Sequence, residues 1–280
     1  MSTYIKLKKD ERIKLFYSAR DNLKISFNNM YPRFKISRAM FFNYLAGRYD
    51  LPKNIFLELE KIANIKIKNY LEVEKERYIE KEILKPKLDS SLAEILGILN
   101  GDGHISPINY EICVVGSILE DDYLNYIQDL FEKTLKLKFT VLQEETKYKL
   151  RTYSKNMVEF LVEEYGLPTG NKMGKLKIPI KILKSKKLLV SYLRGLFDTD
   201  GTFYLRRKTD PVLEISSADY IFLKQVKDAL ITIRFNARIS NTHISIYNKN
   251  HINQFFKIIK PANPKHLKKY QSYLKSCVGS

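Results

Sequence analysis

One short pattern occurs twice in this chain and restricts its fold more than any other feature. The two copies are Leu92–Gly103 and Tyr192–Gly201, and each is an apolar run that ends in an acidic residue followed by glycine. Apolar residues on most sides predict two buried helices, and the internal glycines, Gly97 and Gly195, would let two helix backbones approach closely. The glycine that ends each copy is expected to adopt the left-handed conformation that stops a helix.

The residues around each copy repeat in a common order. In both regions the motif helix is followed by strands, a helix, strands and a further helix, and self-similarity at this length indicates a duplicated domain rather than a solenoid. The sequence therefore predicts an α+β fold with two αββαββα halves. The expected helices are 121–135, 156–165, 219–231 and 250–259, and the expected strands include 202–208, 212–216 and 237–247, with those of the first half ending at Tyr153.

The chain is expected to contain four segments. Residues 1–70 have helical periodicity and are expected to form a separate, all-α domain that binds DNA. The charge-rich segment 71–89 is interpreted as a solvated helix or connector. Residues 90–186 form the first half of the duplicated domain. Residues 187–280 form the second half with a C-terminal helical tail.

The net charge of the chain indicates which kinds of partner it can bind. The 49 Lys and Arg residues against 31 Asp and Glu give a net charge of +18, so a polyanion is expected, with nucleic acid ahead of anionic lipid. No apolar run approaches the roughly 20 residues of a membrane span, and no signal-peptide pattern opens the sequence. We therefore expect an intracellular, cytoplasmic and nucleoid-associated protein. Cys113 and Cys277 are too few and too isolated for a disulfide framework or a zinc site, and a structural role in a reducing compartment is expected.

The acidic ends of the two copies suggest a metal site. Asp102 and Asp200 lie 98 residues apart (102 to 200), each at the negative end of a helix dipole. Together with the preceding carbonyls of Gly101 and Thr199, they offer hard oxygen ligands suited to Mg²⁺ or Mn²⁺, which could serve phosphodiester hydrolysis. The alternative is that each Asp-Gly is merely a helix-ending turn.

These residues resemble the paired signature of the LAGLIDADG homing endonucleases. The match covers about 90–259, and the segments 166–172 and 176–179 resemble the region before the second motif in intein-type and archaeal members. The resemblance implies motif helices packed at a pseudo-twofold axis and two antiparallel sheets that form a saddle over the DNA major groove. It also implies that Asp102 and Asp200 are the metal ligands. Asn100 departs from the family pattern, which has an acid there, and is interpreted as a packing or hydrogen-bonding change.

The resemblance further implies a catalytic basic residue at the end of the last strand of each half. The matching positions are Lys155 and Lys249, each just before a predicted helix. Their expected role is to polarise the attacking water or the scissile phosphate.

Strand alternation predicts the faces that contact DNA, because every second side chain lies on the same face of a strand. Arginine can read guanine edges while lysine anchors phosphates. The expected contacts are Lys147, Lys149, Arg151 and Tyr153 in the first half, and Arg206, Arg207, Lys208, Asn241, His243, Ser245 and Tyr247 in the second.

The N-terminal segment resembles the helix-turn-helix domains of phage repressors. Ser37 is a predicted N-cap of a short helix that ends at Gly47, and a second helix is expected over 54–63. By this resemblance the first of these helices enters the major groove. Arg38, Phe42 and Asn43 are then expected near bases and Arg48 near a phosphate. The alternative is a small helical packing module.

Taken together, the sequence predicts a monomeric, Mg²⁺-dependent, site-specific endonuclease that cleaves double-stranded DNA. Two alternatives stay open. One is a DNA-binding regulator that has lost cleavage, and the other is an RNA-splicing maturase that binds structured RNA on the same basic surface.

Overall fold

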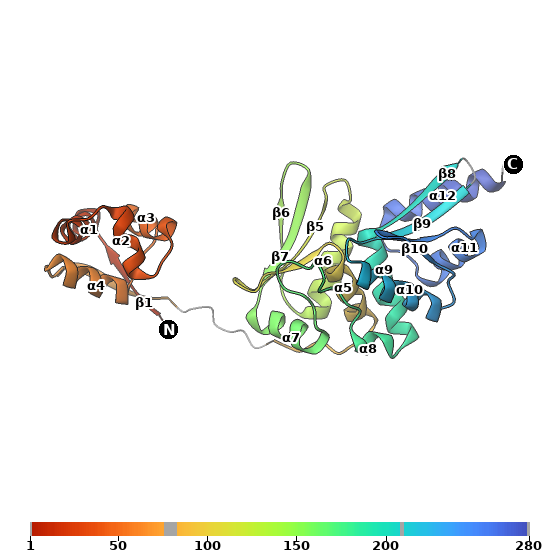
Figure 1. Ribbon diagram of the computed structural model, residues 1–280, viewed down its shortest axis with the longest axis horizontal. Coiled ribbons are helices and arrows are strands. Elements are labelled where there is room, and N and C mark those ends of the chain that lie inside the picture. The colour runs from red at the N-terminus through yellow and green to blue at the C-terminus, as the bar shows by residue number, and fades with distance from the viewer. Residues whose placement is uncertain (1, 76–82, 208–209, 279–280) are drawn as a thin grey trace. The chain divides into compact units, whose positions relative to one another are not determined.

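The computed structural model of the protein describes residues 2–75, 83–207 and 210–278 (Figure 1). The chain divides into two compact units, residues 1–79 and residues 80–280. Each unit has its own hydrophobic core. In the described part of the chain, the helices are too short or too polar to cross a membrane.

The N-terminal unit combines helices with a small antiparallel sheet. Its elements in chain order are β1 (Ser2–Leu7), α1 (Lys9–Leu23), α2 (Phe27–Met30), the 3₁₀ helix η1 (Tyr31–Phe34), α3 (Arg38–Ala46), β2 (Leu51–Pro52), α4 (Lys53–Ala63) and β3 (Tyr70–Lys75). The strand order is β2-β1-β3, so β1 is the central strand. Phe16, Phe41 and Phe56 are buried in the core of this unit.

The prediction of an all-α N-terminal domain is wrong, because this unit contains a three-stranded sheet. β3 pairs along its whole length with β1, from Leu7↔Tyr70 to Ser2↔Lys75, so residues 70–75 form a strand rather than part of a connector helix. Glu72, the first residue of the charge-rich run, lies on this edge strand and forms an ion pair with Lys53 at 2.9 Å. Residues 76–82 of the expected connector lie outside the described residues.

The short helix predicted from its end signals is confirmed. Ser37 is the N-cap of α3, and its Oγ accepts a hydrogen bond from the Met40 amide at 3.2 Å. Gly47 follows with φ of 72°, the left-handed conformation that favours glycine. The next helix, α4, covers the range predicted for it.

The larger unit has the predicted repeated order of elements. The first half contains α5 (Ser90–Asn100), β4 (Gly103–Ile105), β5 (Glu111–Ser117), α6 (Asp121–Leu135), β6 (Thr140–Gln143), β7 (Lys147–Tyr153) and α7 (Lys155–Tyr165). After α8 (Ile180–Leu183), the second half contains α9 (Lys186–Asp200), β8 (Gly201–Arg207), β9 (Asp210–Ser216), α10 (Tyr220–Thr232), β10 (Arg238–Ile239), β11 (His243–Ile246) and α11 (Lys249–Ile258), and α12 (Pro264–Val278) ends the described chain.

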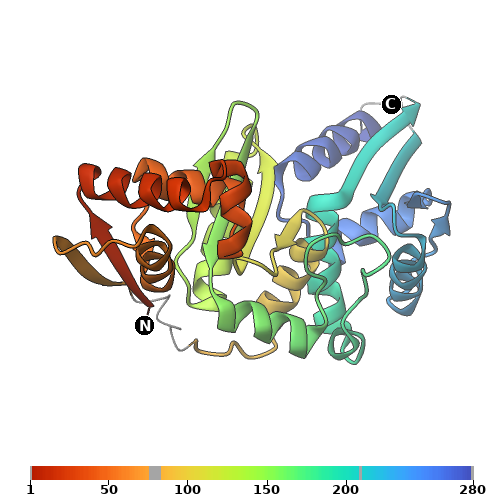
Figure 2. The same cartoon turned by 60° about the vertical axis from the view of Figure 1, so that its left-hand side comes forward.

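Each half forms a four-stranded antiparallel sheet, with orders β4-β5-β7-β6 and β10-β11-β9-β8. Figures 1 and 2 show α5 and α9 side by side between the two sheets. The core face of the first sheet carries Ile112, Val114, Tyr148 and Leu150, which are buried in the same core as α6 and α7. The alternate residues form the opposite face, which we call the open face of the sheet.

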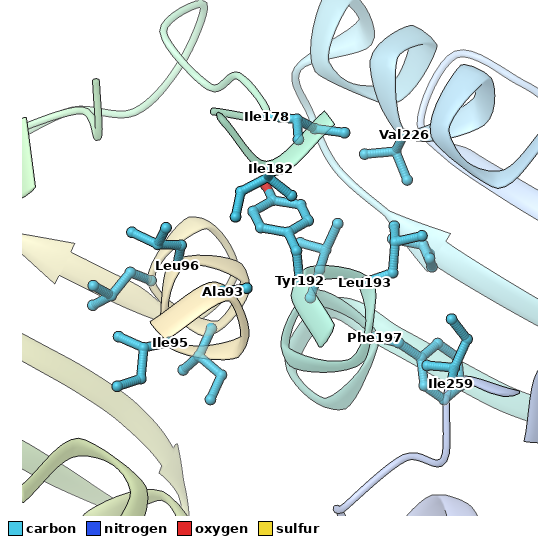
Figure 3. Close-up of a cluster of buried hydrophobic side chains, with 14 of the residues drawn as sticks. Ala93, Ile95, Leu96, Ile178, Ile182, Tyr192, Leu193, Phe197, Val226 and Ile259 are labelled. Carbon is cyan, nitrogen blue, oxygen red and sulfur yellow. The ribbon is translucent and has the colours of Figure 1, made fainter. Parts of the chain in front are cut away.

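The two motif helices pack closely because both have glycine at the point of contact. A Cβ on Gly97 would lie 2.1 Å from the carbonyl oxygen of Tyr192, and one on Gly195 would lie 2.2 Å from that of Glu94. Figure 3 shows Ala93 between these helices, with Tyr192 directed toward Ile182. The reciprocal contacts relate the two halves by a pseudo-twofold axis.

The glycines after the two motifs have a different role from the one expected. Gly201 has φ of −90° and ψ of 158°, an extended backbone, and Gly103 is likewise not among the residues with positive φ. Both are instead places of close approach. A Cβ on Gly103 would lie 2.4 Å from the Leu99 Cα, and one on Gly201 would lie 2.3 Å from the Phe197 carbonyl oxygen. Glycine is therefore required at both positions because a side chain would clash with its neighbours, and not because the backbone is left-handed.

Candidate active site and nucleic-acid interface

The two motif aspartates meet where α5 and α9 end. Asp200 is the last residue of α9, and Asp102 lies two residues beyond the end of α5. A Cβ built on Gly101 would lie 2.0 Å from the Thr199 Oγ1 and 3.4 Å from the Asp200 carboxyl carbon. The ends of the two motif helices therefore lie together, and Asp102 is near enough to Asp200 for its charge to raise the pKa of the Asp200 carboxyl.

The pair of acids is difficult to ionise fully. Burial raises the pKa of Asp200 to about 7, and the negative charge of Asp102 adds to this effect. Burial also raises the pKa of Asp102, and Lys265 and Lys172 oppose that shift. Two neighbouring carboxylates with raised pKa values form a site that gains from a bound cation.

Lys172 lies directly on the end of the first motif helix. Its Nζ donates hydrogen bonds to the carbonyl oxygens of Leu99 at 3.3 Å and Asn100 at 3.0 Å, and to that of Gly101. Burial lowers the pKa of Lys172, while the charges of Asp200 and Asp102 oppose the shift. The ammonium group therefore neutralises both the helix C-terminus and the neighbouring acids.

Lys265 approaches the acids from the second half, but it has a different partner. Its Nζ forms an ion pair with Glu120 at 3.2 Å, and the other oxygen of Glu120 accepts a hydrogen bond from the Asn263 amide at 2.8 Å. Lys265 still lowers the pKa of Asp102 and of Asp200 through its charge, against the dominant effect of burial. Lys172 and Lys265 thus both act on the acids, one from each half, but they have different hydrogen-bond partners.

Sequence reasoning missed both of these lysines. Lys172 follows its aspartate by 70 residues (102 to 172) and Lys265 follows its own by 65 (200 to 265), so a search for a lysine repeated at similar offsets could have found them. Lys155 and Lys249, which the resemblance suggested, also follow the two aspartates at similar offsets, 53 (102 to 155) and 49 (200 to 249). The spacing between an aspartate and a later lysine therefore does not identify the lysines of the site unless the fold of the chain is known.

The structure places Lys155 and Lys249 away from the acids. Gly103 pairs with Val114, which pairs with Leu150, whereas Lys155 lies beyond the far end of β7, as the first residue of α7. Lys155 is 3.8 Å from Glu159 on its own helix. Lys249 acts on the pKa of Asp210, which lies at the end of the β8–β9 pair opposite Gly201.

Each motif also anchors the chain segment that bears a lysine. Asn100 is buried, and its amide donates to the Tyr192 hydroxyl at 2.7 Å and to the Lys177 carbonyl at 3.0 Å. In the second motif the corresponding Asp198 accepts hydrogen bonds from the backbone amides of Ala262 at 2.8 Å and Asn263 at 3.1 Å. Asn100 therefore has the hydrogen-bonding role that its sequence position suggested.

A divalent cation fits this site by its chemistry. Mg²⁺ and Mn²⁺ prefer oxygen ligands, and Mg²⁺ is commonly held by one or two carboxylates with water completing its coordination. Asp102 and Asp200 provide these carboxylates. Among the described residues, no group of three or more His, Cys, Asp or Glu is suited to a metal, so backbone oxygens and water would supply the other ligands. The Gly101 carbonyl already accepts from Lys172, and one lone pair is left for a cation.

The open face of the first sheet carries the predicted basic row. Lys147, Lys149, Arg151 and Tyr153 alternate with buried residues along β7, and all four are at least partly exposed. Cys113 lies on this face opposite Arg151, and it is buried and not in a disulfide. The side chain of Cys277 lies outside the described residues.

The open face of the second sheet is less basic. His243, Asn241 and Tyr247 are at least partly exposed, but Ser245 is only 3% exposed and donates to Glu214 at 3.0 Å, which leaves it badly placed to touch a base. Arg206 pairs with Asp210 at 2.6 Å and lies over the Tyr247 ring at 5.7 Å. Arg207 is exposed next to it, and Lys208 lies outside the described residues.

In the N-terminal unit, the four predicted contact residues belong to α3 or follow it. Arg38 is exposed, donates to Asn28 at 2.9 Å and lies over the Phe42 ring at 5.1 Å. Asn43 accepts from Arg48 at 3.3 Å. The four residues therefore gather around one short helix.

Comparison with known protein families gives a match in the second half. Residues 187–260 match the family model of the LAGLIDADG-like domain. No curated protein matches the chain.

Solved structures align with about three fifths of the chain at low identity. The N-terminal LAGLIDADG domain of DUF199/WhiA is 20% identical, with 61% of this chain and 80% of that one covered and a TM-score of 0.44. The homing endonuclease I-DmoI in complex with DNA and Mn is 17% identical, with 61% and 96% covered and a TM-score of 0.44. The homing endonuclease I-WcaI bound to its DNA recognition sequence is 15% identical, with 64% and 85% covered and a TM-score of 0.47.

The family match covers the second motif, Asp200 and the sheet that follows it. The first half repeats the same order of elements around Asp102. Residues 187–260 are accordingly similar to the LAGLIDADG-like domain, within a duplicated α+β unit built from antiparallel sheets.

Proposed function

We propose that this protein is a site-specific endonuclease that cleaves double-stranded DNA by metal-dependent hydrolysis of phosphodiester bonds. One observation carries the proposal: Asp102 and Asp200, each from one copy of the repeat, meet at the helix ends with a lysine from each half beside them. A paired acidic site on a chain of net charge +18 is suited to a polyanionic substrate.

The residues of the site have separate roles in this proposal. Asp102 and Asp200 would hold a divalent cation, with the backbone oxygens of Gly101 and Thr199 as further candidate ligands. When bound, such a cation supplies Lewis-acid stabilisation of the charge that develops on a phosphodiester.

The two lysines beside the acids supply fixed positive charge. Lys172 and Lys265 would orient the scissile phosphates and stabilise the charge that develops during hydrolysis. These two replace Lys155 and Lys249, which the resemblance suggested, as our candidates for the basic catalytic residues. Lys155 and Lys249 are candidates for phosphate contacts farther along the duplex.

DNA recognition would use both units of the chain. The open faces of the two sheets carry Arg151, Arg206 and aromatic side chains suited to base edges and phosphates. The N-terminal unit would add contacts through α3, in the manner of a helix-turn-helix domain, and two linked modules raise the effective concentration at one site. The duplication supplies both acids within one chain, which favours a monomer.

A protein that binds DNA without cleaving it is the second candidate. Lys172 already donates to the Gly101 carbonyl, one of the oxygens that would complete a cation site. This arrangement would suit a protein that keeps the fold and the basic surface without a working metal centre.

One experiment distinguishes these candidates. The full-length protein is incubated with a randomised duplex library and Mg²⁺, and the ends produced are sequenced. Hydrolysis predicts cut ends at one long site, with none when EDTA replaces Mg²⁺. Enrichment of bound duplexes without cut ends would contradict the endonuclease and support the second candidate, and preferential capture of folded RNA over duplex DNA would contradict both.

A further inference from the structure

We propose that Glu111 is a specificity-determining positioning residue that fixes Arg151 for reading a guanine in the major groove. The inference rests on the proposed function, because it requires that the open face of the first sheet contacts duplex DNA. It concerns which base this face selects and how the selection is achieved.

Glu111 is the common partner of three side chains on β7. Its carboxylate lies 2.9 Å from the Lys149 Nζ and 3.7 Å from an Arg151 nitrogen, and it accepts a hydrogen bond from the Tyr153 hydroxyl at 3.1 Å. The side chain of Glu111 is 8% exposed, whereas those of Lys149 and Arg151 are 27% and 32% exposed. Glu111 is therefore more deeply buried than the basic side chains of β7 that it contacts.

A carboxylate at this position weakens simple attraction to phosphate. Burial alone would raise the pKa of Glu111, but hydrogen bonds from Lys149 and Tyr153, with the charge of Arg151, outweigh burial and lower it. Glu111 is thus ionised and cancels part of the positive charge that the row would otherwise offer to DNA. A surface that bound only the phosphate backbone of DNA would have a higher affinity without this acid.

Glu111 instead restricts the orientation of the Arg151 side chain. Arginine reads a base through a rigid fork of donors, and the fork discriminates only when its orientation is fixed. Arg151 has two restraints, the carboxylate of Glu111 and the Tyr153 ring, whose centroid is 5.7 Å from the guanidinium carbon. A fixed guanidinium on a sheet that enters the major groove fits the O6 and N7 acceptors of guanine.

The matched control is Glu144, in the connection between β6 and β7 of the same sheet. Glu144 forms an ion pair with Lys147 at 3.3 Å, and both side chains are about half exposed, at 49% and 53%. Glu144→Gln therefore changes the charge of the sheet as much as Glu111→Gln does, without touching the side chains held by Glu111.

The test measures binding of full-length protein to a randomised duplex library in EDTA at several salt concentrations. Glu111→Gln should bind random duplex more tightly, with a salt dependence steeper by up to about one ion. It should also lose about tenfold of the preference for guanine at one position of the site. Glu144→Gln should show a similar change in salt dependence and keep the guanine preference.

Arg151→Ala makes the test independent of any effect of Glu111→Gln on folding. Arg151→Ala should lose the preference for the same guanine. The double variant with Glu111→Gln should show little further loss of that preference. Circular dichroism melting of each variant shows whether the fold is retained.

The outcomes separate this inference from the proposed function. If the parent protein selects a site but folded Glu111→Gln or Arg151→Ala selects the same base equally well, the inference is overturned and the proposed function stands. If the parent protein binds no duplex DNA, the proposed function fails and the inference fails with it.

Discussion

At the scale of single residues, the candidate site is a pair of acids with two lysines in unequal surroundings. Lys172 is hydrogen-bonded to the carbonyl end of α5, where burial lowers its pKa, whereas Lys265 is held by Glu120. In our proposal, the two halves would therefore present lysines with different partners to the two strands of a duplex. This inequality makes Lys172 the more informative of the two lysines to change.

Substitution of Lys172 tests which lysines serve the site. Lys172→Met should slow single-turnover cleavage by at least about 100-fold, because a fixed charge beside the reacting phosphate is lost. Lys155→Met, which removes the same charge from the start of α7, should stay within about threefold of the parent rate. Equal losses in the two variants would contradict the placement of Lys172 at the reaction centre.

The sequence identified the acids and not the lysines for a physical reason. Asp102 and Asp200 belong to local patterns in which helix, acid and glycine are adjacent in the chain. Lys172 and Lys265 reach the acids only because the segments before α8 and before α12 fold back across the helix ends. Those paths depend on hydrogen bonds from Asn100 and to Asp198, which are not visible as a periodic pattern.

At the scale of elements, the contact between α5 and α9 holds the two halves together. Their backbones approach at Gly97 and Gly195, and Glu94 and Arg194 form a largely buried ion pair across the same contact at 3.1 Å. This contact also sets the position of the acids, because Asp200 is the last residue of α9 and Asp102 lies two residues beyond the end of α5.

Gly97→Ala should therefore destabilise the larger unit. The added Cβ would lie 2.1 Å from the Tyr192 carbonyl oxygen, so the helices must separate, at a cost of about 2–3 kcal/mol in the free energy of unfolding. Gly170→Ala is the control, because its Cβ would meet nothing within 4 Å and only its φ of 65° is unfavourable, for about 1 kcal/mol. Urea unfolding measures both, and a Gly97→Ala variant as stable as the parent would contradict the packing.

Elements with long periodic patterns could be predicted, and short ones could not. The helix expected over 121–135 coincides with α6, and the order αββαββα holds in both halves. The N-terminal sheet was missed because β2 has two residues and β3 carries charged side chains along an edge. These strands are specified by pairing with β1, a contact between residues about 50 to 70 positions apart.

At the scale of the whole molecule, the chain has two cores and therefore two units that can contribute separately to binding. In our proposal the larger unit cuts and the N-terminal unit adds affinity for one locus. Substitutions in the N-terminal unit should then change binding without changing the chemical step.

The pair Arg38→Ala and Arg48→Ala tests this division of roles. In full-length protein the double variant should bind the selected duplex about tenfold more weakly and show a shallower salt dependence, while the single-turnover rate at saturation is unchanged. The control is the pair Lys14→Ala and Lys61→Ala, which removes two exposed charges from α1 and α4. A greater loss of affinity in the control pair would contradict the assignment of α3 to DNA.

The central claim is that Asp102 and Asp200 together form the centre that hydrolyses DNA. Its most direct test is single-turnover cleavage of the selected duplex in Mg²⁺ by Asp102→Asn and Asp200→Asn, with duplex binding measured in parallel. Each substitution keeps the side-chain shape and removes the charge, so cleavage should fall by at least about 1,000-fold while binding stays within about threefold. Cleavage at the parent rate in both variants would contradict the claim.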